Sequence, residues 1–454
     1  MKIIIVGIGK VGVTLANFFS REGHDVTVID KNQKLINDVV NKYDVMGVCG
    51  NGVSLDVLDE ADIKNTDILI ASASTDETNM LICVLAKKMG VKNTIARIRN
   101  PEYAVKAGSV YNELGITMIA NPEFNAAEEI YRIIRFPSAL KLEKFAGGSI
   151  DIAEIAITDG HPLEGTLLCD LRSHSKVQTL ICAAKRGEDV IIPSGNFEIK
   201  AGDIIYIIAS HSELLLFFKE LNLLKKKIRS VMIIGGSKIA FYLSRMLLKQ
   251  GIDVKIIETD AERCEELANF LPKAVIVNAD GTDGDVLIEE GIDDMDACVM
   301  LTNIDEENII ISLFAGSRNV GKIITKVSRN SLVSMMPQVD SNNSIISPTF
   351  LLANNIVRFV RSIGNAESES NIETLHKIVD NNAEAIEFSM REGSFQKFGI
   401  PLKDIPLKPN ILIACIKRQN TVILPNGNTT IELGDRVIIV TTNEGLTKMD
   451  DILA

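Results

Sequence analysis

The chain has 454 residues, of which 46% are apolar and 24% charged, and its formal net charge is −12. A chain of this length exceeds a single hydrophobic core, so we expect several domains of ordinary size. No stretch approaches the ~18 consecutive apolar residues that a membrane-spanning helix needs. The acidic balance argues against a broad nucleic-acid surface, which needs clustered lysine and arginine.

The cysteines and the N-terminal residues indicate the compartment. The seven cysteines are scattered and include no Cys-x-x-Cys pair. Most lie in apolar runs, where a reduced thiol packs as a small hydrophobe. The N-terminal residues lack the basic flank, apolar segment and small-residue cleavage site of a secretory signal. We therefore expect a cytoplasmic protein, and because the histidines have no metal-ligand spacing, we expect no metal site.

The first predicted elements alternate apolar strands with amphipathic helices. In chain order they are strand 2–6, helix 11–22, strand 25–30, helix 32–41, strand 45–49, strand 68–73 and helix 76–89. This alternation predicts an α/β fold, a Rossmann-like doubly wound parallel sheet with helices on both faces. Gly23 suits the left-handed position after a helix, and Ser74 with Glu77 has the spacing of a capping box.

A smaller back unit follows this front unit. A helix carrying Arg132 and Arg135 leads into it, and short alternating strands such as GDIIYIIAS predict a small α/β domain rich in strands. Near residue 370 the stretch GNAESESN, at 364–371, is typical of a linker.

The second half of the chain repeats the first, which indicates a tandem duplication. Corresponding positions, in one order, are Gly7 and Gly235, Asp30 and Glu258, 67–79 and 296–308, 193–203 and 425–435. The helix-end signals also recur, at Gly251, Asn303 with Glu306, and Arg358 with Arg361. We predict Rossmann-like domains at 1–123 and 228–348, and small C-terminal domains at 143–227 and 370–454.

The segment Gly7-x-Gly9-x-x-Gly12 follows a strand and opens a helix, and Asp30 ends the next strand. This is the context of the dinucleotide-binding fingerprint. The first glycine permits a tight turn, the second lets backbone N–H groups approach a pyrophosphate, and the third lets helix and strand pack closely. The alternative is a tight turn in a domain that has lost its ligand.

Other residues extend this candidate site. Asp30 is expected to bind the adenosine ribose, and its charge favours NAD or NADH over NADP, although Lys31 tempers that preference. Ala73 and Ser74 are predicted to line the cleft, because they end a strand beside the first turn. Arg97 follows another strand and is a candidate to meet a phosphate or a partner's carboxylate.

The second copy departs from the fingerprint. It reads Gly235-Gly236-Ser237-x-x-Ala240, and the Cβ of Ser237 is expected to crowd the approach to a pyrophosphate. Glu258 keeps the ribose-binding function. NAD, an adenine mononucleotide and a vacant pocket all stay open for this site.

An acidic triplet recurs at the start of equivalent helices, as Asp76, Glu77 and Asn79 and again from Asp305 to Asn308. Acidic residues in a first helical turn most often serve capping and the helix dipole, and we interpret them so.

These motifs carry a resemblance to a known family. The segments GIGKVG, VID, STDETNM and IARIR, with the order front, back, front, back over the whole chain, resemble the TrkA family of bacterial Trk potassium uptake and the wider class of domains that regulate potassium conductance. The resemblance implies a regulatory subunit without enzymatic activity, peripheral on the inner face of the cell membrane. It implies a TrkH-type potassium-translocating membrane subunit as partner, and a homo-oligomer, a dimer or a tetrameric ring, assembled through the front units.

The resemblance also implies NAD or NADH at the first site, and NAD or ATP/ADP at the second. The candidate binding residues are Gly7, Ile8, Gly9, Lys10, Val11, Gly12, Asp30, Ala73, Ser74 and Arg97, with Gly235, Gly236, Ser237, Lys238, Ile239 and Glu258 in the second copy.

Two alternative functions stay open. An NAD-dependent oxidoreductase would need a general acid or base near the nicotinamide, and the back units offer no such constellation common to both copies. A structural adaptor with vestigial pockets is the other alternative.

Overall fold

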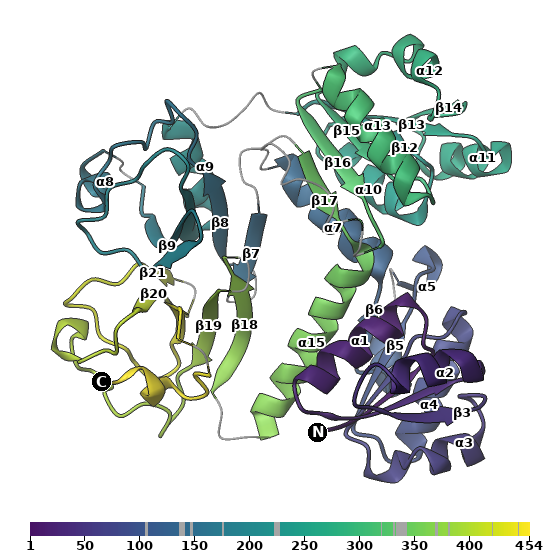
Figure 1. Cartoon of the computed structure of the whole chain (residues 1–454), viewed down its shortest axis with the longest axis horizontal. Coiled ribbons are helices and arrows are strands. Elements are labelled where there is room, and N and C mark those ends of the chain that lie inside the picture. Colours follow the sequence, from purple (N-terminus) through teal and green to yellow (C-terminus); the bar gives the residue numbers. More distant parts are fainter. Residues whose placement is uncertain are drawn as a thin grey trace. The chain divides into compact units, whose positions relative to one another are not determined.

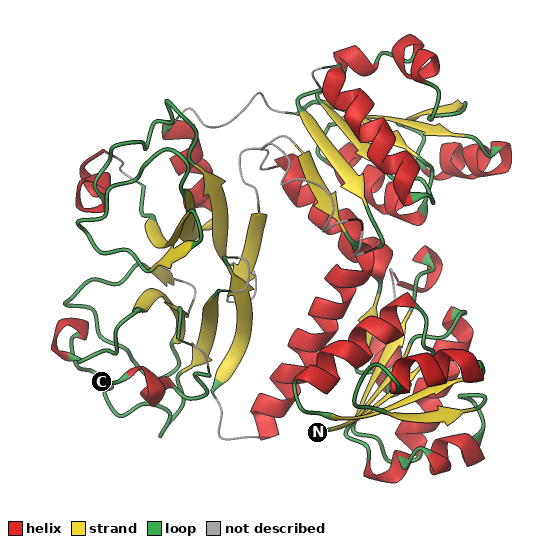
Figure 2. Cartoon of the chain, in the orientation of Figure 1, coloured by secondary structure: helices red, strands yellow, loops and turns green. Residues whose placement is uncertain are grey.

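The computed structural model describes the chain except for residues 105–107, 136–140, 146–148, 175–176, 222–227, 319, 330–331, 333–342, 368–370, 380–381, 420 and 444. Two compact units emerge. The first comprises Met1–Tyr131, Arg229–Gln338 and Ile345–Val360; the second comprises Arg132–Ile228, Val339–Ser344 and Arg361–Ala454. Figure 1 labels their helices and strands, and Figure 2 distinguishes helix from strand. In the described residues no helix combines the length and apolar character needed to cross a bilayer.

The first unit begins with a six-stranded parallel sheet in the order β3-β2-β1-β4-β5-β6. Its strands are β1 (Lys2–Val6), β2 (Asp25–Asp30), β3 (Met46–Cys49), β4 (Ile68–Ala71), β5 (Asn93–Arg97) and β6 (Met118–Ala120). Its helices are α1 (Lys10–Arg21), α2 (Gln33–Val40), α3 (Leu55–Glu60), α4 (Asp76–Lys88), α5 (Pro101–Ala104) and α6 (Gly108–Glu113). The strand order reverses between β1 and β4, where ligands of doubly wound sheets bind. The predicted Rossmann-like α/β fold is therefore confirmed.

A second sheet of the same unit repeats this order as β14-β13-β12-β15-β16-β17. Its strands are β12 (Ser230–Ile234), β13 (Asp253–Glu258), β14 (Val275–Asn278), β15 (Ala297–Met300), β16 (Lys322–Lys326) and β17 (Asn343–Ile346). Its helices are α10 (Lys238–Lys249), α11 (Ala261–Phe270), α12 (Gly284–Glu289) and α13 (Asp305–Ser317). Equivalent strands take equivalent places, so the predicted tandem duplication is confirmed.

The second unit holds two antiparallel sheets, in the orders β10-β9-β11-β8-β7 and β18-β19-β22-β20-β21. The first consists of β7 (Lys141–Phe145), β8 (Ile150–Ala156), β9 (Leu180–Arg186), β10 (Asp189–Ile191) and β11 (Ile204–Ser210), with helices α8 (Leu168–His174) and α9 (His211–Glu220). The other consists of β18 (Ile372–Ile378), β19 (Ala383–Ser389), β20 (Ile411–Arg418), β21 (Thr421–Ile423) and β22 (Arg436–Thr441). One apolar cluster contains residues of both sheets, among them Cys182 and Cys415, so the two small domains share a core.

Two helices connect front and back parts: α7 (Pro122–Arg135) and α15 (Pro348–Glu367). The linker predicted at 364–371 is wrong in its first half, because α15 runs to Glu367. Residues 368–370 of that stretch lie outside the described residues. A polar, small-residue sequence stays helical here because it extends a helix that has already been nucleated by its apolar N-terminal half.

At the helix ends, the predicted C-terminal glycines are confirmed and the predicted N-terminal capping boxes are not. Gly23 and Gly251 follow α1 and α10 with φ of 74° and 71°, the left-handed conformation predicted. The predicted capping boxes are wrong. The Thr75 hydroxyl caps α4 by accepting from Thr78 N, and Ile304, at the N-cap position of α13, provides no side-chain cap.

In each small domain an arginine at the end of one strand forms an ion pair with a buried aspartate just before a neighbouring strand. Arg186 donates two hydrogen bonds to Asp203, both 2.7 Å long, and Arg418 donates two of 2.9 Å to Asp435. Both aspartates are buried, and each also accepts a backbone N–H, from Lys200 in the first domain. Burial raises the pKa of Asp203, but the hydrogen bonds of Arg186 and of Lys200 N outweigh it and hold the pKa below its usual value.

We predict that Asp203 makes the second unit acid-sensitive. Because its pKa is lower folded than unfolded, its stabilisation is present above the unfolded pKa of about 3.9 and is lost as the pH falls below it. Asp203→Asn should lower the free energy of unfolding at pH 7 by about 1–3 kcal/mol and flatten its fall between about pH 5 and 2. Urea denaturation across that range measures both effects. Asp189→Asn, at an exposed strand start, is the control, and equal profiles for the two variants would contradict the prediction.

Candidate functional site

The backbone geometry of the first glycine turn shows which fingerprint glycines the fold requires. Gly7 has φ of 93°, and a Cβ there would lie 2.7 Å from backbone atoms of Ser72 and Ala73. A Cβ on Gly12 would lie 2.1 Å from the Gly7 carbonyl oxygen. Gly9 is different: its φ is −76°, and a Cβ would meet nothing within 4 Å. Packing therefore does not require glycine at position 9, which fits the approach of a ligand from outside.

An acidic side chain braces each turn in the same way. Asp30 accepts hydrogen bonds from Ile8 N at 2.7 Å and Asn32 N at 2.9 Å. In the second copy Glu258 accepts from Gly236 N at 2.6 Å and from Asp260 N at 2.9 Å. Each Asp30 oxygen accepts one of these bonds and has a further lone pair, so this acid can hold the turn and also accept from a ribose hydroxyl; in Glu258 the oxygen bonded to Asp260 N also accepts from the Thr259 hydroxyl.

The N-termini of the two helices behind the turns differ. Gly9 leaves α1 without a side-chain cap, whereas the Ser237 hydroxyl accepts from Ala240 N and caps α10. The first N–H groups of a helix have no intrahelical partner and form an anion-binding end. The first copy therefore offers the fuller set of donors, and Ser237 acts by occupying a donor as well as by the crowding expected from its Cβ.

The recurrent acidic triplet has a different role from the predicted capping. Asn79 accepts a hydrogen bond from Ala73 N at 2.7 Å and donates one to the Arg97 carbonyl at 2.8 Å. Asp76 accepts from Arg99 N and Asn100 N. Both side chains are buried and join the loop after β4 to the end of β5. We call this Asp and Asn pair the strand clamp.

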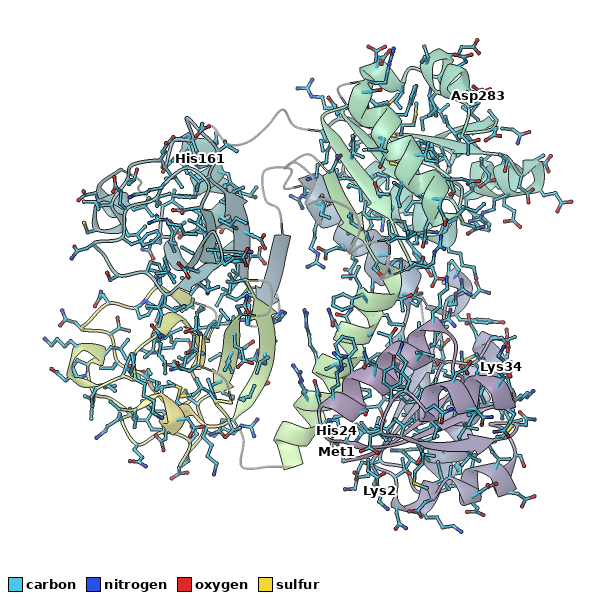
Figure 3. The ribbon with its side chains drawn as sticks, in the orientation of Figure 1. Met1, Lys2, His24, Lys34, His161 and Asp283 are labelled. Atoms are coloured by element: carbon cyan, nitrogen blue, oxygen red, sulfur yellow. The ribbon has the colours of Figure 1, made fainter. Side chains whose placement is uncertain are left out.

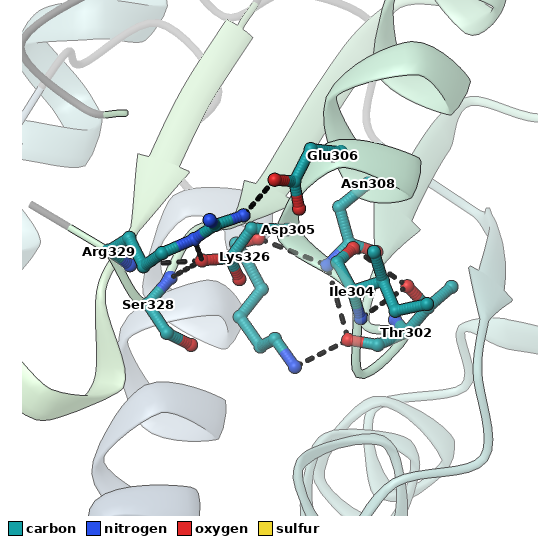
Figure 4. A network of polar contacts seen from close by, with 8 residues as sticks. All are labelled: Thr302, Ile304, Asp305, Glu306, Asn308, Lys326, Ser328 and Arg329. Atoms are coloured by element: carbon teal, nitrogen blue, oxygen red, sulfur yellow. Dashed lines mark hydrogen bonds and ion pairs between the residues drawn. The ribbon is translucent and has the colours of Figure 1, made fainter. Parts of the chain in front are cut away.

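The second copy repeats the strand clamp, as Figure 4 shows. Asn308 accepts from Thr302 N and donates to the Lys326 carbonyl at 3.1 Å. Asp305 accepts from Ser328 N and Arg329 N, both at 3.0 Å. The capping interpretation is therefore wrong for these residues, because their side chains reach the next strand instead of their own helix.

The glutamates between the clamp residues bind side chains at the surface of the domain. Glu77 accepts a hydrogen bond from the Tyr103 hydroxyl at 3.1 Å, and Glu306 forms an ion pair with Arg329. Both glutamates are exposed, so they contribute little to the buried network.

A cationic residue is the last residue of the strand that the clamp holds, β5 in the first copy and β16 in the second. Burial, and then the neighbouring Arg99, lower the pKa of Arg97, whose buried Nε has no hydrogen-bond partner among the described residues. Lys326 occupies the equivalent place, is only 8% exposed, and donates a hydrogen bond to the Thr302 carbonyl. Burial lowers its pKa too. The sequence analysis did not single out Lys326, although the repeat pairs it with Arg97.

A cavity of about 990 Å³ lies in the first unit and is lined from both Rossmann domains. Asn121 Nδ2 donates to the Tyr242 hydroxyl, and Phe124 packs edge-on against the Tyr242 ring, so the domains are in contact beside it. The cavity brings together these predicted residues: Gly9, Lys10, Val11, Arg97, Gly235, Gly236, Ser237, Lys238, Ile239 and Glu258.

Other predicted residues do not belong to the described lining of this cavity: Gly7, Ile8, Gly12, Asp30, Ala73 and Ser74. Gly7 and Ile8 form the turn itself, and Ala73 N is bound by the clamp. The lining adds residues that sequence reasoning missed, among them Arg99, Glu123 and Arg263. Arg99 and Glu123 form an ion pair, and Arg263 donates to the Gly236 carbonyl. No group of three or more potential metal-ligating side chains occurs within the described ranges.

Fold and site together define a class: a chain of two Rossmann-like domains with glycine-rich strand-to-helix turns, alternating with small antiparallel domains. Family models agree with this division. The TrkA-N domain matches residues 3–122 and 231–348, and the TrkA-C domain matches residues 152–222 and 398–454.

Curated relatives resemble the chain over its full length. It is 31% identical to the Trk system potassium uptake protein TrkA homolog of Archaeoglobus fulgidus, over 100% of both chains. It is 32% identical to the Trk system potassium uptake protein TrkA of Vibrio alginolyticus, over 98% of this chain and 96% of the relative. The chain belongs to the TrkA family of Trk system potassium uptake proteins.

Solved structures share the fold. The GsuK channel bound to NAD superposes with a TM-score of 0.63 at 17% identity, over 98% of this chain and 77% of that chain. The GsuK RCK domain superposes with a TM-score of 0.62 at 16% identity, over 98% of this chain and 92% of that chain.

The strand clamp predicts a stability cost at Asn79. Asn79→Ala would leave the partly buried Ala73 N and the Arg97 carbonyl without their amide partner, and should lower the free energy of unfolding by about 2–3 kcal/mol. Urea denaturation followed by circular dichroism measures it, because the chain has no tryptophan. Glu77→Ala, two residues away and exposed, should stay within about 0.5 kcal/mol of wild type. Equal stabilities for the two variants would show that the clamp is dispensable.

Proposed function

We propose that this chain is a nucleotide-binding regulatory subunit that gates a potassium-uptake channel or transporter in response to NAD(H) and to ATP or ADP. The observation that carries the proposal is the start of α1. There Gly9 has no packing role, no side chain caps the helix, and a braced carboxylate lies at the end of the neighbouring strand. A nucleotide needs such a surface for its phosphates and its ribose.

Gating follows from the way the first unit is built. A ligand shifts a conformational equilibrium only by its difference in affinity for the two conformations. Lys10 and Arg97 from one Rossmann domain and Lys238 and Glu258 from the other line one cavity. A nucleotide bound there touches both domains, so its affinity depends on how they are arranged. Binding and domain arrangement are thereby coupled.

The proposal extends to partners and location. We place the chain on the cytoplasmic face of the cell membrane, bound to a TrkH-type potassium-translocating subunit, as a homo-oligomer built through its Rossmann domains. The proposed domain boundaries are 1–123, 143–227, 228–348 and 370–454. The names of the relatives, Trk system potassium uptake proteins, support the transport role.

We propose that the chain has no catalysis of its own. Regulation requires only nucleotide binding, and the geometry described above supplies binding groups. Steady oxidation of NADH with small metabolites, followed by absorbance, would instead support the oxidoreductase alternative.

Asp30→Ala should weaken NADH binding at the first site by about tenfold to a hundredfold, because it removes the charged acceptor for the ribose. Titration of NADH fluorescence on the full chain measures the affinity. Asp25→Ala is a matched control at the other end of β2. Asp25 is exposed, bonded through its N–H to the Met1 carbonyl, and adjacent to His24, which Figure 3 labels with Met1 and Lys2 where β1 begins. Equal NADH affinities for the two variants would contradict ribose binding by Asp30.

Gly9→Ser separates ligand approach from folding. Because a Cβ at Gly9 meets nothing, the variant should unfold within about 0.5 kcal/mol of wild type, while its hydroxyl caps α1 and weakens nucleotide binding at the first site about tenfold. Thermal denaturation and NADH titration measure the two quantities. An unchanged NADH affinity in a folded Gly9→Ser chain would exclude phosphate binding at this turn.

A further inference from the structure

The two copies place different cations at one position. Arg97 and Lys326 each end the clamped strand, and their backbone carbonyls accept from Asn79 and Asn308 in the same way. The clamp bonds are shared, so a guanidinium in one copy and an ammonium in the other follow the same anchored backbone position.

The Lys326 ammonium lies beside the second glycine turn. It donates to the Thr302 carbonyl, and Thr302 N is 2.9 Å from the position of a Cβ on Gly235. Lys326 and Lys238 both line the cavity with this turn. The ammonium is therefore at the phosphate end of the second site.

This ammonium is costly to bury. Desolvation is the main cause that lowers its pKa, and repulsion from Lys10 of the first copy adds to it. Asp305 and Glu123 act in the opposite direction. A phosphate between Lys10 and Lys326 would relieve the repulsion and supply the oxygen acceptors that three ammonium donors require.

The kind of cation affects which ligand fits. A planar guanidinium stacks on a flat ring, whereas an ammonium is a compact, strongly hydrated point charge. Arg97 thus tolerates a nicotinamide ring, and Lys326 favours a terminal phosphate, which carries more negative charge than either phosphate of a dinucleotide. The Ser237 hydroxyl already accepts a hydrogen bond from Ala240 N at the start of α10. One helix N–H fewer is left for a phosphate, so the second site depends more on its lysine side chains.

We propose that the second site takes a nucleoside di- or triphosphate in preference to a dinucleotide, with Lys326 binding the terminal phosphate. This inference rests on the proposed function, in which both copies bind nucleotides. It assigns Lys326 as the residue that sets the preference, and Asn308 as the residue that positions it.

The test uses the full chain carrying Asp30→Ala, in which the first site is weakened about tenfold to a hundredfold, so that the second site is titrated at the lower ligand concentrations. Isothermal titration with AMP, ADP and NAD gives three affinities. Lys326→Met, which keeps the length of the side chain without its charge, should weaken ADP binding by about tenfold to a hundredfold and leave AMP binding unchanged. AMP affinity is the internal check on folding, because AMP uses the same adenosine pocket and lacks only the terminal, β-phosphate of ADP.

Two further variants sharpen the result. Lys255→Met removes a half-buried lysine of the same domain, bonded to Glu290 and outside the cavity lining, and should change none of the affinities. Lys326→Arg imitates the first copy and should reduce the ratio of ADP to NAD affinity about tenfold.

The inference would be overturned if Lys326→Met left the ratio of ADP affinity to AMP affinity unchanged. It would also be overturned if Lys326→Arg left the ratio of ADP affinity to NAD affinity unchanged. Wild-type protein that binds neither ADP nor NADH would overturn the proposed function itself, so the two failures are distinguishable. Should Lys326→Met fail to fold, the Lys326→Arg ratio decides alone.

Discussion

The close approach of the glycine turn to the backbone after the fourth strand is the constraint on which the site depends. At Gly7 and at Gly235 a Cβ would lie within 3 Å of the backbone of the neighbouring segment. Only glycine allows this approach at a positive φ. The turn then aims the start of the following helix at the carboxyl edge of the sheet, where its unpaired N–H groups face the cleft. The acid at the end of the second strand and the strand clamp hold the surrounding backbone in register with it.

The duplication provides an internal comparison, because two copies of one design differ at few points of the site. The acid keeps its role in both, although Asp30 is shorter than Glu258, and each bonds the same N–H of the turn. The clamps are likewise equivalent. The copies differ at the second and third fingerprint positions and at the cation that ends the fifth strand of each sheet. These differences change the donors available to a ligand and leave the fold unchanged.

The cavity between the Rossmann domains couples ligand binding to the arrangement of these domains. Its lining comes from both copies, and its charged groups include Lys10 and Lys326, which repel each other. Binding of an anion at such a place changes the electrostatic energy of the domain interface. The free energy of ligand binding is thereby available to a rearrangement, which is what a regulatory subunit needs.

The sequence alone determined the elements and the duplication, because apolar periodicity and glycine positions are local properties of the chain. Helix α1 and strands β1 and β2 lie within one residue of their predicted bounds. The role of Gly7 was also predictable, since a tight turn between strand and helix requires it. The capping interpretation of Asp76 and Asn79 was wrong because they bond Arg99 N and the Arg97 carbonyl, more than fifteen residues away along the chain. Lys326, Glu123 and Arg263 became site residues only in the folded unit, because desolvation and the approach of a second domain depend on contacts that no local pattern specifies.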